Sequence, residues 1–360
     1  MTDSELLLDP HWAWLFSPLV TARPLRPQLD RGLTRIGEYL DCQVELLRDA
    51  HRRGDASAAE LIRACLPVDQ PLTREAAREA IARDHRYADW VEALAHADDS
   101  VDGGFEAACD AIQWGDVDAL EALLDGRPEL VQARSPFPHR AMLLHHVAAN
   151  GIEVERQLQT PCNAVEIMRL LLERGAEPDA VCDAYSGRDT TLGLLVSSAH
   201  PAAAGVQAAL AEELCRGGAR VDGLDDDGAP LWTAISFGYT GAAEALARCG
   251  ARADNVVFAA ALGRLADVCG YFDADGRLAS ARAASAERLG LYGPPLEPGR
   301  LVDYALIYAA LHGRRDVVPF LLDKQPDLTF TEPLFHNTAA GAAKWAGDDA
   351  IVALLAAAQR

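Results

Sequence analysis

Apolar positions along residues 104–360 come in pairs of short runs with helical spacing, and a glycine separates the two runs of each pair. In the clearest pair, residues 227–254, the first run follows Pro230 and ends at Gly238, and the second covers residues 240–249. Proline suits the first helical turn, where its missing N–H would have no partner, and glycine suits the left-handed residue after a helix. The pattern therefore predicts antiparallel helix pairs with little or no regular sheet.

Similar pairs recur along the chain, and two of them are interrupted. The further copies are Glu106–Asp125, Met142–Ala180, Thr190–Asp222, Asn255–Phe272, Tyr304–Asp323 and Thr338–Ala357. One insertion covers residues 152–161, and another covers residues 273–302, where a helix is expected from Arg277 to Leu289. Insertions in a repeat array form loops on one face, which is often the binding face.

The repeated unit resembles the ankyrin repeat, whose pattern is T-P-L-H-x-A-A-x-x-G, a second helix with paired leucines, and a G-A-x-x-(D/N) ending. His145 occupies the histidine position of that pattern, whereas Trp232 stands there in the clearest copy, and no copy has a complete T-P-L-H. Several glycines recur at about the family period of 33 residues. The resemblance covers residues 104–360 and implies an all-α ankyrin-repeat solenoid of about seven repeats, several of them degenerate.

Residues 1–103 lack this pattern and are expected to form a helical N-terminal segment. Helices are predicted at residues 33–53, 57–66, 72–83 and 87–97, with Ser57 and Thr73 as caps of the second and third. The stretch around Trp90 resembles a segment that precedes ankyrin repeats in certain uncharacterised bacterial proteins. A solenoid end needs a polar-faced cap, so the segment is interpreted as a cap, with an independent domain as the alternative.

The aromatic stretch at residues 9–27 contains Trp12, Trp14 and Phe16. It is expected to pack on this segment, and a partner-binding arm is the alternative.

Composition narrows the range of partners. The formal net charge of −21 disfavours nucleic acid and anionic membrane surfaces, which are themselves polyanions. The eight cysteines form no C-x-x-C pair, which is typical of small buried side chains in a reducing compartment. No signal peptide and no apolar run long enough to span a membrane is recognised, so a cytoplasmic location is expected.

Candidate chemistry is sparse. Phosphate-loop, nucleophile-elbow and H-E-x-x-H patterns are absent from the sequence. His145 and His146 are adjacent on a predicted helix and point about 100° apart, so they are not expected to share a metal. The sequence therefore predicts no catalytic residue, cofactor or metal, although an enzyme is not excluded.

Two functional hypotheses follow. The first is a protein-interaction module that binds an unidentified protein through the concave face and turn tips of the array, with contacts from Tyr185, Arg188, Trp232, Phe237 and Tyr239. The alternative is an enzyme or small-ligand-binding protein that uses a groove between the N-terminal helices and the first repeats, bordered by His139, Arg140, His146 and Arg156.

Overall fold

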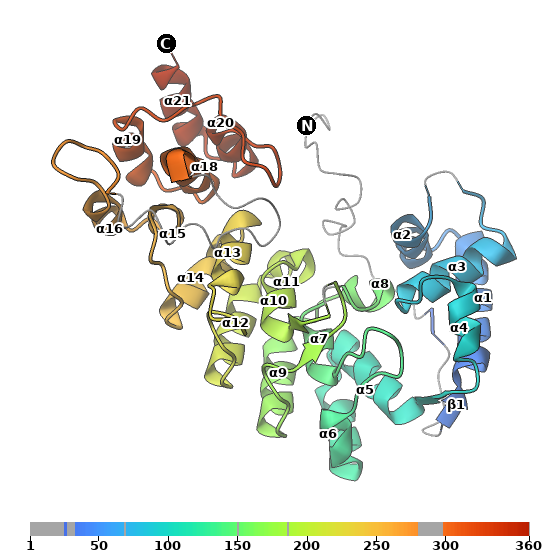
Figure 1. Cartoon of the computed structure of the whole chain (residues 1–360). Coiled ribbons are helices and arrows are strands. Elements are labelled where there is room, and N and C mark those ends of the chain that lie inside the picture. The colour runs from blue at the N-terminus through green and yellow to red at the C-terminus, as the bar shows by residue number, and fades with distance from the viewer. Residues whose placement is uncertain are drawn as a thin grey trace. The chain divides into compact units, whose positions relative to one another are not determined.

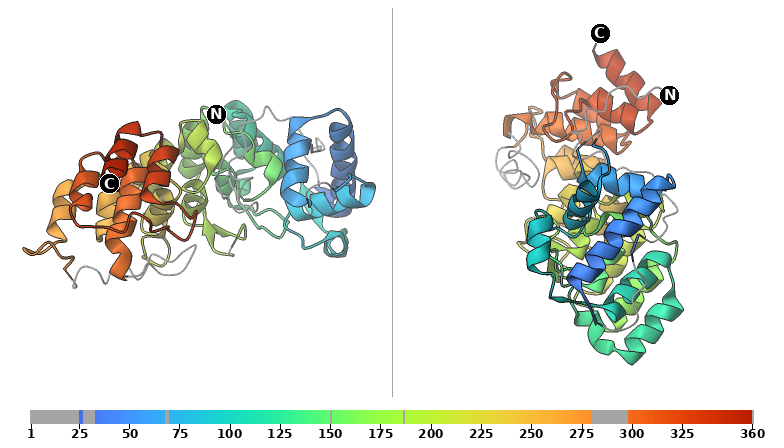
Figure 2. Two further views of the ribbon diagram at one scale, coloured as in Figure 1. Left: turned by 90° about the horizontal axis from the view of Figure 1, so that it is seen from above. Right: turned by 90° about the vertical axis from the view of Figure 1, so that its right-hand side faces the viewer.

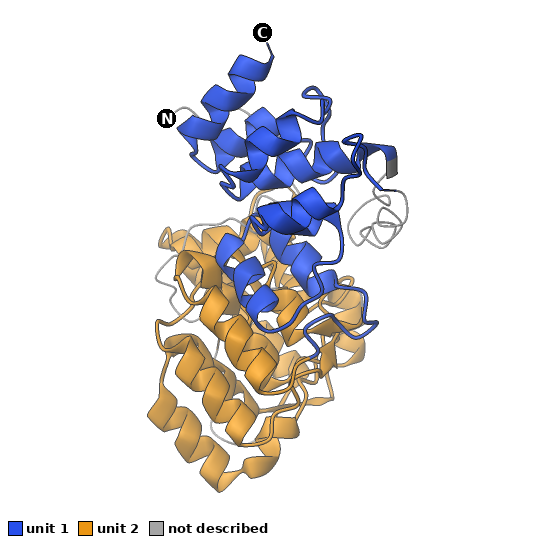
Figure 3. Cartoon of the chain, turned by 90° about the vertical axis from the view of Figure 1, so that its left-hand side faces the viewer, with its two compact units in different colours: residues 1–9, 220–360 blue, residues 10–219 orange. Residues whose placement is uncertain are grey.

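The computed structural model describes residues 25–26, 33–67, 70–149, 151–185, 187–279 and 298–359. The chain divides into two compact units, one ending at Ala219 and the other beginning at Arg220, and each is considered by itself (Figure 3). The aromatic residues Trp12, Trp14 and Phe16 lie outside the described residues. Most of the helix expected at residues 277–289 also lies outside them.

The unit that ends at Ala219 begins with an N-terminal helical segment (Figure 1). Its elements are β1 (Leu33–Arg35), α1 (Ile36–Arg52), α2 (Ala56–Cys65), α3 (Arg74–Asp84), α4 (Trp90–Ala95) and β2 (Ser100–Asp102). The antiparallel pairing of β1 with β2 joins Thr34 to Val101 and replaces the first helical turn that the apolar pattern had predicted. A residue-by-residue pattern missed this strand because its partner lies far along the chain.

The caps of these helices follow local side-chain chemistry. Thr73 accepts a hydrogen bond from the Ala76 N–H at 3.2 Å, which confirms the predicted cap of α3. The cap of α2 is Asp55 and not Ser57, because the Asp55 carboxylate accepts from the Ser57 N–H at 2.9 Å. The prediction was therefore wrong by two positions at α2.

Helix pairs follow in the same unit. They are α5 (Gly103–Trp114) with α6 (Val117–Gly126), α7 (Leu143–Val147) with α9 (Ala164–Glu173), and α10 (Thr191–Leu195) with α12 (Gln207–Arg216). Shorter elements interrupt them, namely η2 (Pro128–Gln132), α8 (Val154–Gln157), the strands β3 (Val181–Cys182) and β4 (Asp189–Thr190), and α11 (Ala199–Ala203). Figure 2 shows the N-terminal helices beside α5 and α8, and α8 contacts both α2 and α5.

The core of the N-terminal segment includes Phe137, which follows the first helix pair, and a hydrogen bond joins the segment to α5. Tyr39 of α1 and Phe137, which follows η2, are fully buried, and their rings lie 5.9 Å apart. The Tyr39 hydroxyl also donates to Glu106 of α5 at 2.9 Å. Apolar and polar contacts therefore join residues that are far apart in sequence.

The unit that begins at Arg220 consists of further helix pairs. They are α13 (Ala229–Ser236) with α14 (Thr240–Arg248), α15 (Val256–Ala261) with α16 (Leu265–Gly270), α18 (Leu301–Leu311) with α19 (Val317–Leu322), and α20 (Ala339–Trp345) with α21 (Asp349–Ala358), with η4 (Pro298–Arg300) before α18. The first helices α15, α18 and α20 contact one another in sequence order, as stacked repeats do. The predicted all-α repeat architecture is confirmed, and the number of complete repeats stays a prediction.

Glycines with positive φ follow the first helices α5, α13, α15, α18 and α20, as the sequence predicted. The exceptions are α7, where Ala149 has a φ of +47°, and α10, which is followed by Val196. Gly238, after α13, has a φ of +76°, and its N–H donates to the Ile235 carbonyl at 3.1 Å. The space around Gly238 is adequate, because an added Cβ would meet the Leu311 side chain at 3.5 Å, an ordinary contact. The requirement for glycine there is therefore conformational and not steric.

We predict that Gly238→Val lowers the free energy of unfolding by roughly 1–2 kcal/mol, because a β-branched residue resists the left-handed region. Gly299→Val is the control in the same unit, since Gly299 lacks a positive φ and has open space around it. Thermal unfolding of both variants measures the effect. Equal melting temperatures for the two variants would contradict the assignment of strain to Gly238.

Candidate functional site

The insertion at residues 152–161 folds inward and carries charged side chains into the protein. Glu153, Glu155, Arg156 and Gln157 are each no more than 5% exposed, although they occupy consecutive or nearly consecutive positions around the single turn of α8. Burial of an ionised side chain costs several kcal/mol unless opposite charges and hydrogen bonds compensate it. The surrounding elements must therefore supply the partners of these residues.

Glu153 is the centre of the resulting network. Its carboxylate lies 2.9 Å from Arg156 Nη1 and 3.3 Å from Arg26 Nη1. His85 Nδ1, at the end of α3, lies 3.0 Å from Glu153 Oε1. Burial alone would raise the pKa of Glu153, but the two guanidinium groups hold it well below its ordinary value.

Arg156 links the insertion to α5. Its Nη2 donates to Glu106 Oε2 at 2.9 Å and to Asp110 Oδ1 at 2.8 Å. Glu106 also accepts the hydrogen bond from Tyr39 described above. We call this set the buried ionic cluster, and its members are Arg26, Tyr39, Asp84, His85, Glu106, Asp110, His139, Glu153, Glu155 and Arg156.

Glu155 faces a different part of the chain. Its carboxylate accepts the Leu25 N–H at 2.7 Å and lies 3.1 Å from Arg26 Nε. Burial raises the pKa of Glu155 from 4.5 to about 7, and Arg26 offsets only part of that shift. Glu155 therefore titrates near neutral pH while it holds residues 25–26 against α8.

His85, His139 and Glu153 could in principle hold a metal ion, because one donor atom from each lies within 4.8 Å of the others. The hydrogen bonds argue against ligation by His139. Its Nδ1 accepts the Ala141 N–H at 3.1 Å, so the proton of the neutral ring is on Nε2, the atom that faces Glu153. Two guanidinium groups beside Glu153 would also repel a cation, so the donor set fits a hydrogen-bonded ion network better than a metal site.

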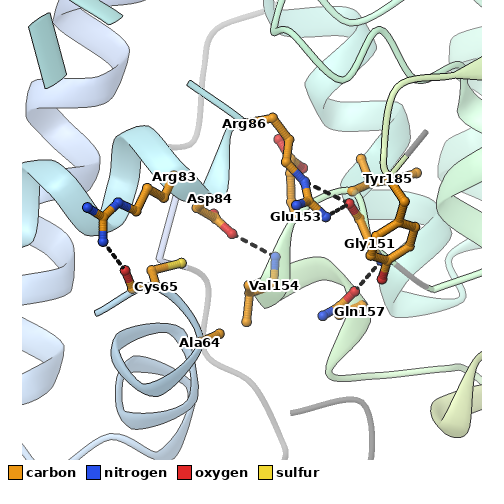
Figure 4. Close-up of a pocket in the computed structure, with 11 residues that line it drawn as sticks. Ala64, Cys65, Arg83, Asp84, Arg86, Gly151, Glu153, Val154, Gln157 and Tyr185 are labelled. Carbon is orange, nitrogen blue, oxygen red and sulfur yellow. Dashed lines mark hydrogen bonds between the residues drawn. The ribbon is translucent and has the colours of Figure 1, made fainter. Parts of the chain in front are cut away.

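A pocket of about 340 Å³ lies beside the cluster (Figure 4). Its walls come from the end of α2, the end of α3 with the residues after it, the insertion, and the β3–β4 hairpin. The lining residues are Ala64, Cys65, Arg83, Asp84, Arg86, Gly151, Ile152, Glu153, Val154, Gln157 and Tyr185. Burial raises the pKa of the Cys65 thiol, which keeps it protonated and makes it a poor nucleophile.

Arg86, Gly151 and Tyr185 form one edge of the pocket. The Arg86 guanidinium donates to the Gly151 carbonyl from Nε at 3.0 Å and from Nη2, and it lies 5.4 Å from the centre of the Tyr185 ring. Gly151 has a φ of +72°, which favours glycine, and the Tyr185 ring packs against it, since an added Cβ would come within 2.6 Å of Tyr185 Cζ. Arg86 itself has a φ of +68°, a strained conformation that is often kept at functional sites.

Three of the four residues of the alternative groove are buried close together, and the fourth is exposed. Arg156 and His139 belong to the buried ionic cluster, and His146 is buried beside it, with its ring centre 6.3 Å from that of His139. Arg140 is exposed. None of the four lines the pocket, although the pocket lies between the N-terminal helices and the first repeats, where the groove was expected.

The residues predicted to bind a partner fall in both units. Tyr185 is 45% exposed on the β3–β4 hairpin, and Arg188 is exposed on the same hairpin. Phe237 and Tyr239 are half-buried and stacked, with ring centres 6.3 Å apart. Trp232 is buried in the core of its unit, where its ring packs edge-on against Tyr308.

The histidine at the conserved position of the repeat pattern shows how the pairs are joined. His145 Nδ1 accepts the Met142 N–H at 3.1 Å, and its Nε2 donates to the Ala180 carbonyl at 2.9 Å. Burial lowers the pKa of His145 to about 4, which keeps it neutral and fixes this tautomer. His145 therefore has a structural role, and its neighbour His146 points elsewhere.

This bonding and the series of helix pairs, most of them with a glycine of positive φ after the first helix, match the expected repeat. The chain has the ankyrin-repeat fold. No family model matches it. A stretch of 71 residues is 41% identical to the E3 ubiquitin-protein ligase XB3 of Oryza sativa subsp. japonica, and the match covers 20% of this chain and 13% of that protein.

Two solved structures are similar to this ankyrin-repeat protein at 18% identity and a TM-score of 0.35, and each alignment covers 70% of the chain. One is a chain in the complex of the Bd0816 predatory endopeptidase from Bdellovibrio bacteriovorus with immunity protein Bd3460, covered over 97% of its length. The other is the human ASB11 ankyrin repeat domain, covered over 96%.

We predict that Arg156→Met lowers the free energy of unfolding by about 3–5 kcal/mol, because it leaves Glu106 and Glu153 buried without their shared cation. Arg35→Met is the control, since its ion pair with Asp98 is exposed and contributes at most about 1 kcal/mol. Urea unfolding measures both. A loss below about 1 kcal/mol for Arg156→Met would show that the cluster does not depend on this residue.

We predict that the raised pKa of Glu155 makes the free energy of unfolding depend on pH. Its pKa is higher in the folded protein than in the unfolded chain, so its stabilising contribution is complete below about pH 4.5 and is lost as pH rises through about 7. Relative to Glu155→Gln, the natural protein should lose on the order of 3 kcal/mol of unfolding free energy across this window. Urea titrations at several pH values test this, and a difference that is constant with pH would refute it.

Proposed function

We propose that this ankyrin-repeat protein is a protein-interaction module and that the β3–β4 hairpin is part of its binding surface. The observation that carries the proposal is the exposed ring of Tyr185, held between Arg86 and Gly151. Aromatic and arginine side chains contribute most of the binding energy at protein interfaces. A ring that is already held in place also loses little conformational entropy when a partner binds.

The hairpin supplies a second contact through Arg188, which is exposed close to Tyr185 in sequence. In the other unit, Phe237 and Tyr239 are the proposed contacts, because part of each ring is exposed. We assign Trp232 a packing role, since only 6% of it is exposed. Binding through the concave face and turn tips of the array is the arrangement that we propose for these contacts.

Charge restricts the proposed partner. With a formal net charge of −21, the chain favours a protein that is basic or neutral at its contact surface over a nucleic acid. Among the described residues, no helix has both the length and the apolar character needed to cross a membrane. We therefore propose a protein as the partner.

A second candidate function is the binding of a small ligand. The pocket beside Tyr185 favours it, because its volume of about 340 Å³ falls in the range typical of ligand sites. The lining combines apolar side chains with a few polar groups, as such sites do. This function would use the region between the N-terminal helices and the first repeats.

The test is quantitative capture from the native host with tagged natural protein and with the double variant Tyr185→Ala, Arg188→Ala. We expect a set of proteins that the natural chain enriches and that the double variant loses at least tenfold. Trp114→Ala is the control, because Trp114 is an exposed aromatic residue of α5 outside the hairpin and the pocket. Equal recovery with the double variant and the control would contradict the role of the hairpin.

A further inference from the structure

The walls of the pocket are largely apolar. Ala64 and Cys65 of α2 contribute one side, and Ile152 and Val154 of the insertion contribute another. The Tyr185 ring stands at the edge (Figure 4). A space of about 340 Å³ with such walls suits one apolar side chain or a small molecule of similar size.

The acidic groups of the lining are already satisfied. Asp84 accepts the Val154 N–H at 2.7 Å and lies 3.5 Å from Arg26 Nη2. Glu153 is paired with Arg26 and Arg156 on the side of the buried ionic cluster. Their charges are therefore compensated within the protein and leave little attraction for a cation in the pocket.

The basic groups of the lining differ from one another. Arg83 donates a hydrogen bond to the Cys65 carbonyl at 2.9 Å and forms an ion pair with Glu79 at 3.9 Å. Arg86 is bound only to the Gly151 carbonyl and the Tyr185 ring, and within the described parts of the chain no carboxylate forms an ion pair with it. A half-buried guanidinium without a counter-charge is an anion-binding group, since it retains N–H donors on Nη1.

We infer that the pocket binds a monocarboxylate with an apolar body, its carboxylate on Arg86 and its body between the apolar walls and Tyr185. A phosphate dianion fits less well, because Arg86 is the one cation without an ion pair among the described residues of the lining, and the Asp84 and Glu153 carboxylates lie in the same lining. The ligand is either a free organic acid or the C-terminal residue of a peptide. The inference deepens the second candidate function and rests on it.

Calorimetric titration of the full chain separates these sources. The probes are 4-methylpentanoate as a free acid, N-acetyl-leucine as a mimic of a peptide C-terminus, N-acetyl-leucinamide as its uncharged counterpart, and inorganic phosphate. We expect saturable binding of one or both carboxylates and at least tenfold weaker binding of the amide and of phosphate. Stronger binding of N-acetyl-leucine indicates a peptide C-terminus, and stronger binding of 4-methylpentanoate indicates a free acid.

Two variants test the site itself. Arg86→Gln should weaken carboxylate binding at least tenfold, because it removes the guanidinium on which the carboxylate is proposed to lie. Arg63→Gln, on the exposed face of α2, makes the same charge change and should have no effect. Ala64→Phe fills the pocket without altering charge and should also abolish binding. It replaces Arg86→Gln as the deciding variant if thermal unfolding shows that Arg86→Gln does not fold.

The inference is overturned if neither carboxylate binds, if phosphate or the amide binds equally well, or if Arg86→Gln and Ala64→Phe bind as the natural protein does. Protein capture through Tyr185 and Arg188 can succeed in each of these cases. The hairpin function would then stand while the pocket assignment fails.

Discussion

Neutralising the buried Glu153 carboxylate is the constraint on which this end of the ankyrin-repeat protein depends. A single carboxylate with 2% exposure requires cations that are themselves buried. These are Arg156, three residues further along, and Arg26, far away in the sequence. Arg156 in turn requires Glu106 and Asp110 of α5. Each buried charge is compensated by an opposite charge from another part of the chain. The insertion, the N-terminal segment and the first repeat therefore constrain one another.

The same network explains the position of the pocket. Asp84 at the end of α3 accepts the Val154 N–H, which fixes the start of α8 against the N-terminal helices. Gln157, at the end of α8, accepts the Gly151 N–H at 2.7 Å, and the Gly151 carbonyl receives Arg86. The insertion is therefore held at both ends, and the backbone that it presents orients Arg86 and Tyr185. The charges of the buried ionic cluster are paired with one another, whereas the Arg86 guanidinium faces the pocket.

The sequence predicted what local patterns determine. Glycine after most of the first helices and the Thr73 cap depend on nearby residues, and the structure confirms them. The β1 strand and the buried insertion were missed because their partners are remote: the Leu25–Glu155 bond joins residues 130 positions apart. Charged residues around one turn predict a solvated loop unless their distant partners are known. Nothing in the sequence marks Arg86 as a binding residue. It differs from most of the other described arginines in its backbone conformation and in its lack of an ion pair, and both are seen only in the structure.

Hydrogen exchange under native conditions, followed by mass spectrometry, tests most directly whether the buried ionic cluster makes the N-terminal segment and the first repeat one cooperative unit. The account predicts that the slowest amides of α1, α3 and α5 share one free energy of opening. It also predicts that Arg156→Met lowers that free energy for all three helices together. Exchange of α1 and α3 through a separate opening of lower free energy, with α5 still protected, would contradict the account.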